Sequence, residues 1–480
     1  MKRMIAAALL LAATVFAQQT TPPPPAAPRE ARVPQPVEKT LSNGLRVIVI
    51  PKHDVPLVAA HLLIRTGSEA DAKGREGLAQ LTATVLTKGT KTRKAEEIAR
   101  GIENLGATLD TDAGWDSSSV SISVMSANLD KAMDYVADVV RNPTFATEEF
   151  ERERQQAIDE ISVAMSEPRS LANFVVAKVL FADAPYGHNV SGTPASLAKI
   201  TRDDLVKFHR DAYRPGNAIL VLGGDVKADA AFALAEKQFG SWPKGTAPAA
   251  SSKSSAEASA PRVVVIDMPD AGQAAVVVAR RGIRRADPQF FSAIVANSIL
   301  GLGYSSRLNQ EVRIKRGLSY GASSNFDTRR DVGPFTASAQ TKNESAAEVA
   351  GIIIDEMNRL AATDVPDAEL VPRKAVIIGG FARSLETSSG IADRISALAQ
   401  YGLPLSDINR YIGNVQAINA ENVRTFAGKN ISGTGANVVI VGNAKAFLEP
   451  LKARFENVEV IPIRELDLGA ASLRERKIKQ

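Results

Sequence analysis

The sequence repeats itself at long range, and this repetition constrains the fold more than any other feature. The run AAHLLIRTGSEAD at 59–71 matches AAVVVARRGIRRAD at 274–287, since each is an apolar stretch followed by a glycine. The runs NAILVLGGDV at 217–226 and NVVIVGNA at 437–444 also match, because both are β-rich and end at glycine. Such a repeat predicts two similar domains in tandem.

A low-complexity stretch separates the two copies. Residues 244–262, KGTAPAASSKSSAEASAPR, lack apolar periodicity and are predicted to be an interdomain linker. The N-terminal domain is expected over 37–243, the C-terminal domain over 263–468 and a basic tail over 469–480. Amphipathic stretches such as 147–165 lie between the strand-like runs, so each half is predicted to be α+β, a sheet with helices packed on it. Two such lobes would enclose a cavity, where pockets are favoured.

The N-terminus has the pattern of a secretory signal peptide. Two basic residues precede an apolar run over 4–16 and a small-residue cleavage site ends at Ala17, which predicts a signal peptide over 1–17. The run is shorter than the roughly 20 residues that cross a bilayer, so a membrane anchor is the less favoured alternative. Residues 18–36 are rich in proline and are expected to form a disordered spacer.

Composition excludes several functional classes. The chain has no cysteine, which excludes disulfides, thiolate nucleophiles and cysteine-rich zinc sites. Export without disulfides fits a periplasmic or secreted protein of a bacterial envelope, with no integral membrane segment in the mature chain. The formal net charge is +5, and outside the tail RERKIKQ the basic residues are interspersed with acids. Nucleic-acid binding is therefore not supported.

The stretch GLAQLTATVLTKGT at 77–90 has the frame of a metal-binding helix without its ligands. With the two halves and the linker, it resembles the M16 metallopeptidases (pitrilysin, insulinase and mitochondrial processing peptidase), and more closely the M16B branch, over most of 37–450. The resemblance implies two tandem homologous α/β domains of the LuxS/MPP-like type, which form half of a clamshell. Active members carry His-x-x-Glu-His here, whose imidazoles bind zinc from one helix face and whose glutamate activates water.

Alignment on the flanking G-x-A and K-G-T places Gln80 and Thr84 at the ligand positions and Ala83 at the position of the base. Amide and hydroxyl groups are poor substitutes for imidazoles, and alanine cannot accept a proton from water. Glu160, 76 residues beyond Thr84, keeps the position of the third ligand. One carboxylate does not make a zinc site, so Glu160 is interpreted as a solvated or paired helix residue. No metal or other cofactor is expected in this chain.

The histidines offer no alternative metal site in the sequence. None of the four is at ligand spacing from another: His53, His61, His188 and His209. Each is predicted to be an ordinary strand, loop or surface residue.

The second half contains SSRLNQEVRIKRGLSYGASSNF at 305–326. In the family, an arginine and a tyrosine seven positions apart reach across the cavity to the substrate near the zinc, and Arg313 and Tyr320 have this spacing. A helix that ends at Gly317, followed by a strand, would place both side chains near one corner. Tyrosine can donate to an oxyanion and arginine can hold a peptide carbonyl. Alternatively, Arg313 is a solvated helix residue and Tyr320 packs on the sheet.

The stretch GATLDTDAGWDSSSVSISV at 106–124 is predicted to be an edge strand, because serine alternates with valine and isoleucine. Family members bind extended peptides by strand addition here. The resemblance therefore implies that Asp110, Thr111 and Asp112 bind substrate, although Asp110 stands where active relatives usually have asparagine. An ordinary amphipathic strand explains the alternation equally well.

The leading hypothesis is that the chain is the non-zinc-binding subunit of a heteromeric M16B-like zinc peptidase of the bacterial envelope. An M16-like partner with an intact motif would hold the zinc, while this chain would supply Arg313, Tyr320 and half of a chamber for unfolded peptides. The alternative is a catalytically inert peptide-binding or structural pseudoenzyme of the M16 fold. An autonomous protease would need a nucleophile or metal that the sequence does not offer.

Overall fold

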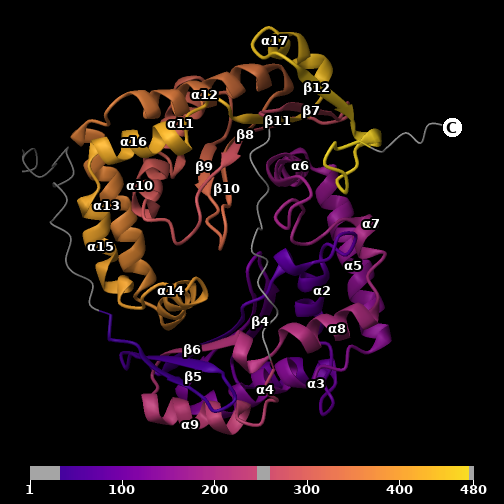
Figure 1. Ribbon diagram of the computed structural model, residues 1–480, viewed down its shortest axis with the longest axis vertical. Helices are drawn as coiled ribbons and strands as arrows, with labels where there is room; N and C mark the ends of the chain where they lie inside the picture. The colour runs from indigo at the N-terminus through magenta and orange to yellow at the C-terminus, as the bar shows by residue number, and fades with distance from the viewer. Residues whose placement is uncertain (1–32, 246–259, 475–480) are drawn as a thin grey trace, which may run out of the picture.

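The computed structural model describes residues 33–245 and 260–474 of the chain. The predicted signal peptide lies outside the described residues, as do residues 18–32 of the predicted spacer, 246–259 of the predicted linker and 475–480 of the predicted tail. The described part forms two halves, each built on a six-stranded sheet (Figure 1).

The sheet of the first half has the strand order β1-β2-β6-β3-β5-β4. Its strands are β1 (Val37–Thr40), β2 (Arg46–Pro51), β3 (Leu57–Ile64), β4 (Thr108–Ala113), β5 (Ser118–Met125) and β6 (Ala218–Gly224). Successive side chains of a strand point to opposite faces. In β2, Val47 and Val49 enter one hydrophobic core and Ile48 and Ile50 enter another. This sheet therefore separates two cores.

The sheet of the second half has the order β12-β7-β11-β8-β10-β9. Its strands are β7 (Val263–Asp267), β8 (Ala274–Arg281), β9 (Ala322–Phe326), β10 (Pro334–Thr341), β11 (Asn437–Gly442) and β12 (Val458–Pro462). Strand β11 is buried along its whole length, as is β6 in the first half. Continuous apolar runs of this kind are typical of strands covered on both faces.

The two sheets share one topology. Strand β6 pairs in parallel with β2 and antiparallel with β3, and β11 pairs in the same way with β7 and β8. Each half then adds an antiparallel hairpin, β4-β5 or β9-β10, beside β3 or β8. The predicted duplication of an α+β domain is confirmed.

In each half, the helices are interspersed with the strands along the sequence. In the first half they are α2 (Leu78–Val85), α3 (Ala95–Asn104), α4 (Leu129–Arg141), α5 (Thr147–Ser166), α6 (Pro168–Phe181), α7 (Pro194–Leu197), α8 (Arg202–Ala212) and α9 (Ala228–Phe239). In the second half they are α10 (Phe290–Gly301), α11 (Arg307–Asn309), α12 (Ala346–Ala362), α13 (Asp367–Ser384), α14 (Ser388–Gln400), α15 (Asp407–Ala417), α16 (Ala420–Asn430) and α17 (Leu448–Lys452). None of the helices described combines the length and hydropathy needed to cross a bilayer.

Proline separates the two long helices of the first half. Because proline disfavours the helical conformation of the residue before it, α5 stops at Ser166 and Glu167 is extended. Pro168 is then the first residue of α6, a position where its missing N–H costs no helical hydrogen bond. The break turns the chain from the first half toward the second.

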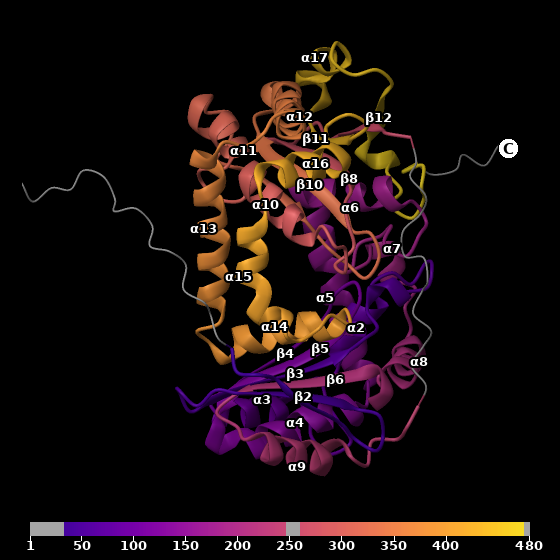
Figure 2. The ribbon, with the colours of Figure 1, turned by 60° about the vertical axis from the view of Figure 1, so that its left-hand side comes forward.

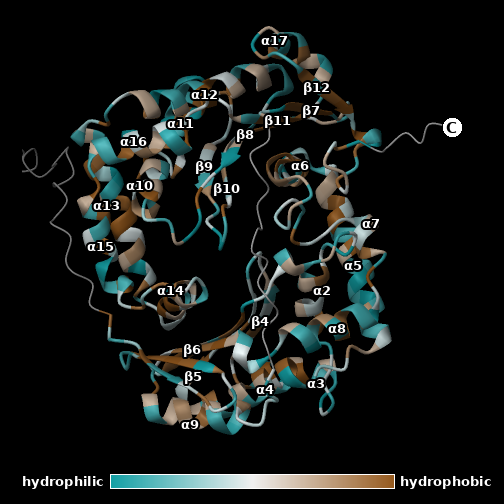
Figure 3. Ribbon diagram, in the orientation of Figure 1, coloured by the Kyte–Doolittle hydropathy of each residue, from teal (hydrophilic) through white to brown (hydrophobic). Residues whose placement is uncertain are grey.

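The two halves exchange helices across their boundary. Three apolar residues of α6, namely Leu171, Val175 and Val179, share a core with the second-half strands β7, β8 and β11. In return, Ile391 and Ile395 of α14 share a core with β2, β3 and β6 of the first half. Figure 2 shows α14 across the first-half sheet, and Figure 3 shows hydrophobic colour along β6 facing it. Burial of apolar area is the main source of folding stability, so each half is completed by a helix of the other.

The ends of the described chain are packed on the second half. Val33, near the end of the predicted spacer, is buried. Its backbone N–H donates to Asn409 Oδ1, and its carbonyl accepts from Asn409 Nδ2. Leu473, in the predicted basic tail, is buried in the core that contains α6. Val33 and Leu473 therefore pack on the folded body, although the sequence places them in the spacer and in the tail.

The loop between β9 and β10 connects the second half to the first. Arg330 Nη1 lies 2.9 Å from the buried carboxylate of Glu69. Its backbone N–H donates to Asp116 Oδ2 over 2.7 Å. The neighbouring Arg329 guanidinium lies 4.0 Å from the ring centre of Trp115, within the range of a cation–π contact. Two consecutive arginines thus hold the halves together.

This connection is expected to make stability depend on pH. Burial raises the pKa of Glu69 to about 7 from an ordinary 4.5, although Arg330 opposes the shift. Folding therefore takes up a proton at this site, and the stability that it contributes is present below the ordinary pKa and is lost as the pH rises through 7. Glu69→Gln cannot titrate. The difference in free energy of unfolding between this variant and the wild type should therefore shift by roughly 2 kcal/mol in favour of the variant as the pH rises from about 5 to about 8.

Urea denaturation of both proteins across this range measures the difference. The other titrating groups are present in both chains, so their contributions largely cancel. A difference that stays constant with pH would contradict the assignment to Glu69.

Candidate functional site

Helix α2, which carries Gln80 and Thr84, packs beside α5, which carries Glu160. All three side chains line one small pocket of about 130 Å³. The other residues that line it are Gly77, Leu81, Glu153, Gln156, Ala157, Ile161, Ser191 and Leu197. Ala83 is fully buried and lies outside this lining. The structure thus brings three of the four positions together and leaves the fourth in the core.

The side chains at these positions are engaged in local hydrogen bonds. Gln80 Oε1 accepts from the backbone N–H of Ala113 on β4 over 2.9 Å. The Thr84 hydroxyl donates to the carbonyl of Gln80 over 3.0 Å, and Glu160 accepts from Gln156 over 2.9 Å. These bonds tie α2 to β4 and join side chains on successive turns of α5.

Glu153 is a second carboxylate in this pocket. It is only 5% exposed, and its Oε1 lies 3.1 Å from both Lys88 and Arg152. A buried carboxylate requires such cationic partners, because desolvation of an unpaired charge is costly. Glu153 therefore has the contacts of a structural ion pair.

The four histidines lie apart and contact different groups. Their partners are Asp225 for His53, Asp393 for His61, the carbonyls of Ser68 and Asn189 for His188, and the carbonyl of Val140 for His209. Burial lowers the pKa of His209 to about 4 and also lowers the pKa of His188. Among the residues that the structure describes, no three His, Cys, Asp or Glu side chains are grouped to hold a metal ion.

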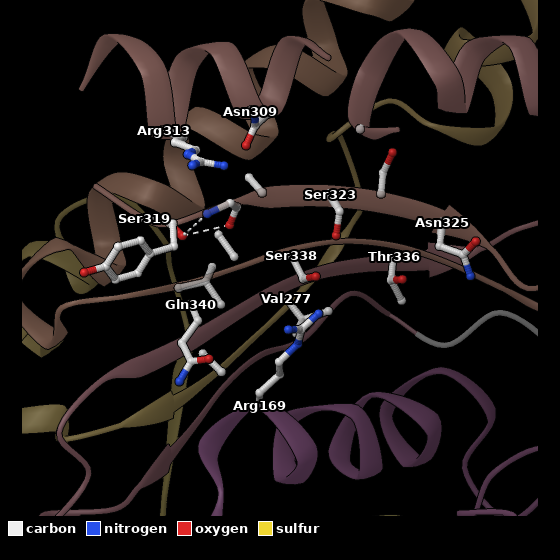
Figure 4. Close-up of a pocket in the computed structure, with 18 of the residues that line it drawn as sticks. Arg169, Val277, Asn309, Arg313, Ser319, Ser323, Asn325, Thr336, Ser338 and Gln340 are labelled. Atoms are coloured by element: carbon white, nitrogen blue, oxygen red, sulfur yellow. Dashed lines mark hydrogen bonds between the residues drawn. The ribbon is translucent and has the colours of Figure 1, made fainter. Parts of the chain in front are cut away.

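A second, larger pocket of about 760 Å³ lies against the sheet of the second half (Figure 4). Arg313 and Tyr320 both line it, together with residues of β8, β9, β10 and α6. The Arg313 guanidinium lies 5.2 Å from the ring centre of Tyr304. Tyr320 is 90% exposed. This exposure does not fit the alternative in which Tyr320 packs on the sheet, whereas the exposed side chain of Arg313 fits both interpretations.

The local structure explains how these two side chains reach the pocket. Arg313 lies on η4 (Gln310–Lys315), a π-helical segment that continues α11. π-Helical segments are rare in proteins, and those that occur are often found at functional sites. Gly317 adopts a φ of 61° and ends the helical segment, as predicted. The predicted strand after it begins only at Ala322, because Ser319 first forms a hydrogen-bonded turn with Gly321. Tyr320 thus sits at the tip of a turn.

Asp110, Thr111 and Asp112 lie on β4, at the outer edge of the first-half sheet. The predicted single edge strand over 106–124 is in fact a hairpin, since the Ser-Val alternation belongs to the inner strand β5. The Gly114 N–H donates to the carbonyl of Ser117, so these two residues form a hydrogen-bonded pair. Hydrogen-bonded and non-hydrogen-bonded pairs alternate along an antiparallel ladder, so the backbone N–H and C=O of Thr111 point away from β5. The edge is therefore open at Thr111, while Gln80 occupies the N–H of Ala113.

Comparison with known proteins identifies the family to which this fold belongs. Residues 46–194 match the family described as Insulinase (Peptidase family M16), and residues 199–375 match the Peptidase M16 inactive domain. The chain belongs to the M16 peptidase family. An uncharacterized zinc protease of Mycobacterium tuberculosis is 30% identical over 395 residues, which cover 82% of this chain and 90% of that protein. The uncharacterized zinc protease YmxG of Bacillus subtilis is 24% identical, over 81% and 94% of the two chains.

Solved structures show the same M16 architecture. The peptidase M16 inactive domain from Pseudomonas fluorescens matches with a TM-score of 0.79 and 28% identity, over 85% of this chain and 98% of that one. A protease from Helicobacter pylori matches with a TM-score of 0.81 over 86% and 100% of the two chains, and at 23% identity it shows the fold alone. The two tandem M16 domains follow from these matches and from the repeated topology.

The zinc implied by the M16 fold does not fit the residues of the small pocket. Zinc in proteins is bound by imidazole, thiolate or carboxylate. Of the residues that line this pocket only Glu160 and Glu153 offer such a ligand, and Glu153 is paired with Lys88 and Arg152. The Gln80 oxygen is also committed to the backbone of β4. The small pocket therefore does not support metal-dependent catalysis by this chain.

The sequence did not indicate two residues of the larger pocket. Arg169 and Asn173 lie on α6 in the first half, yet they line the pocket of the second half. No motif surrounds them, because their place depends on the exchange of α6 between the halves.

Proposed function

We propose that this M16 chain is the non-zinc-binding subunit of a heteromeric peptidase of the bacterial envelope, where it is periplasmic or secreted. A partner subunit with an intact His-x-x-Glu-His motif supplies the zinc. This chain supplies Arg313, Tyr320 and one half of a chamber for unfolded peptides, whose extended backbone can pair with β4 beside Asp110 and Asp112.

The observation that carries the proposal is the separation of the two sites. The small pocket has lost its metal ligands, and it shares no lining residue with the larger pocket. Arg313 and Tyr320 are nevertheless exposed in the larger pocket, where a hydroxyl and a guanidinium can act on a peptide held by another chain. Relatives over most of the chain that are named zinc proteases support a link to proteolysis.

A specific contact favours the second candidate, an inert peptide-binding or structural pseudoenzyme. Gln80 fastens α2 to β4, so the former metal position now has a structural bond. In that case the chain needs no zinc-binding partner, and Arg313 and Tyr320 are dispensable.

Reconstitution separates the two candidates. The purified chain should contain no stoichiometric zinc and should cleave no unfolded peptide. Mixed with an M16 subunit that has the intact motif, it should raise chelator-sensitive cleavage by roughly 10² or more over that subunit alone, since the partner gains an oxyanion donor. A partner whose motif glutamate is replaced by glutamine is the control and should remain inactive.

Chelator-sensitive cleavage by the pure single chain would overturn the assignment as a non-zinc subunit. A stable complex without any gain in cleavage would favour the pseudoenzyme.

A further inference from the structure

Two arginines face the larger pocket from different halves of the molecule. Arg169 is in the first turn of α6, and Arg313 is on η4. Figure 4 shows the two side chains approaching the strands from opposite sides. Both residues are exposed, and within the described part of the chain neither forms an ion pair with a carboxylate. The pocket therefore carries two uncompensated positive charges.

The rest of the lining is polar but not acidic. No aspartate or glutamate is among the described residues that line the pocket. Hydroxyl and amide groups of the strands and of the preceding turn also line it: Ser319, Ser323, Asn325, Thr336, Ser338 and Gln340. A cleft lined by charge of one sign concentrates ligands of the other sign, and hydroxyl and amide donors can complete the hydrogen bonds of an anion.

We propose that Arg169 binds a carboxylate of the substrate peptide in this pocket, while Arg313 remains available to the peptide backbone. The planar guanidinium fork matches a carboxylate, and carboxylates are the anionic groups that unmodified peptides carry. The group can be an Asp or Glu side chain or the C-terminus, since both present the same chemistry. Arg169 is then a specificity-determining residue supplied by the first half. The inference rests on the proposed function in that the ligand is a peptide, but the site lies wholly in this chain.

Peptide binding to the purified full chain tests the proposal without a partner subunit. The probes are three versions of one short, unlabelled, N-acetylated Gly-Ser-Ala peptide, and binding is measured by isothermal titration calorimetry. The first has a central Glu and an amidated C-terminus, the second a central Gln and an amidated C-terminus, and the third a central Gln and a free C-terminal carboxylate. They are compared on the wild type, Arg169→Gln and Arg100→Gln. Arg100 is an exposed arginine on α3, outside both pockets, and serves as the matched control.

At least one carboxylate peptide should bind the wild type about tenfold more tightly than the neutral peptide, the weight of one charge-assisted hydrogen bond. Arg169→Gln should abolish most of this preference, while Arg100→Gln keeps it. Preference for the first peptide assigns the site to an acidic side chain, and preference for the third assigns it to the C-terminus. Equal affinity of all three peptides, no binding to the wild type, or a preference that survives Arg169→Gln would overturn the proposal. Because no cleavage is measured, failure of the reconstituted peptidase remains a separate result.

Discussion

Tyr320→Phe is expected to lower the turnover of the reconstituted peptidase by about 10², the usual cost of losing one oxyanion donor, while the complex keeps its size. The physical basis is the position of Tyr320. It is 90% exposed at the tip of the turn before β9 and belongs to no hydrophobic core. Its replacement by phenylalanine therefore removes a hydroxyl without disturbing the packing, and under the proposed function the lost interaction is one made in the transition state.

The measurement is kcat and KM for an unfolded peptide, with the mass of the complex determined in parallel. Arg313→Ala should raise KM more than it lowers kcat, because a guanidinium that holds a peptide carbonyl binds substrate and transition state alike. Tyr135→Phe on α4 is the matched control, since it removes a tyrosine hydroxyl outside both pockets. Full activity of both Tyr320→Phe and Arg313→Ala would make these residues scaffold and would favour the pseudoenzyme.

At pH 8, where Glu69 is largely ionised in the wild type, Arg330→Ala is expected to destabilise the chain by about 3 kcal/mol, because it leaves a buried carboxylate without its cation. Arg330 pairs with Glu69 over 2.9 Å, and its guanidinium also donates to the carbonyls of Arg65 and Asp116. All three partners belong to the first half, so the substitution weakens the joint between the halves rather than one domain.

Urea denaturation of three variants measures this effect. Arg410→Ala, which breaks an exposed ion pair with Asp407, should change stability by less than about 1 kcal/mol. The double variant Arg330→Ala/Glu69→Gln should recover part of the loss, since the carboxylate that lost its partner is also removed. A loss for Arg330→Ala no larger than that for Arg410→Ala would show that the loop between β9 and β10 contributes little to the joint.

Local patterns were sufficient for the domain duplication and for the altered metal positions. The apolar runs that form β3 and β8 are rich in β-branched and aliphatic side chains, which fit a buried sheet. The i, i+4 relation between Gln80 and Thr84 is likewise fixed by helix geometry. The chemistry of those two side chains does not depend on the rest of the fold.

The position of the edge strand in the sheet is not specified by local patterns. Alternation of serine and valine indicates which side chains of β5 face the core, but it carries no information about the neighbours of that strand in the sheet. The outer position of β4 depends on pairing of β5 with β3, which lies far away in the sequence. The local period was therefore correct and the position in the sheet was not.

The sequence by itself determined that the chain contains two α+β copies and that His-x-x-Glu-His is absent from the first. Only the tertiary structure decided that α6 packs on the sheet of the second half and α14 on the sheet of the first. It also decided that Arg169 and Arg313 line one pocket and that Arg330 pairs with Glu69. The physical reason is that an apolar helix face can pack on either of two similar sheets, so its periodicity does not specify the partner. That choice is made when both sheets bury their remaining apolar faces together.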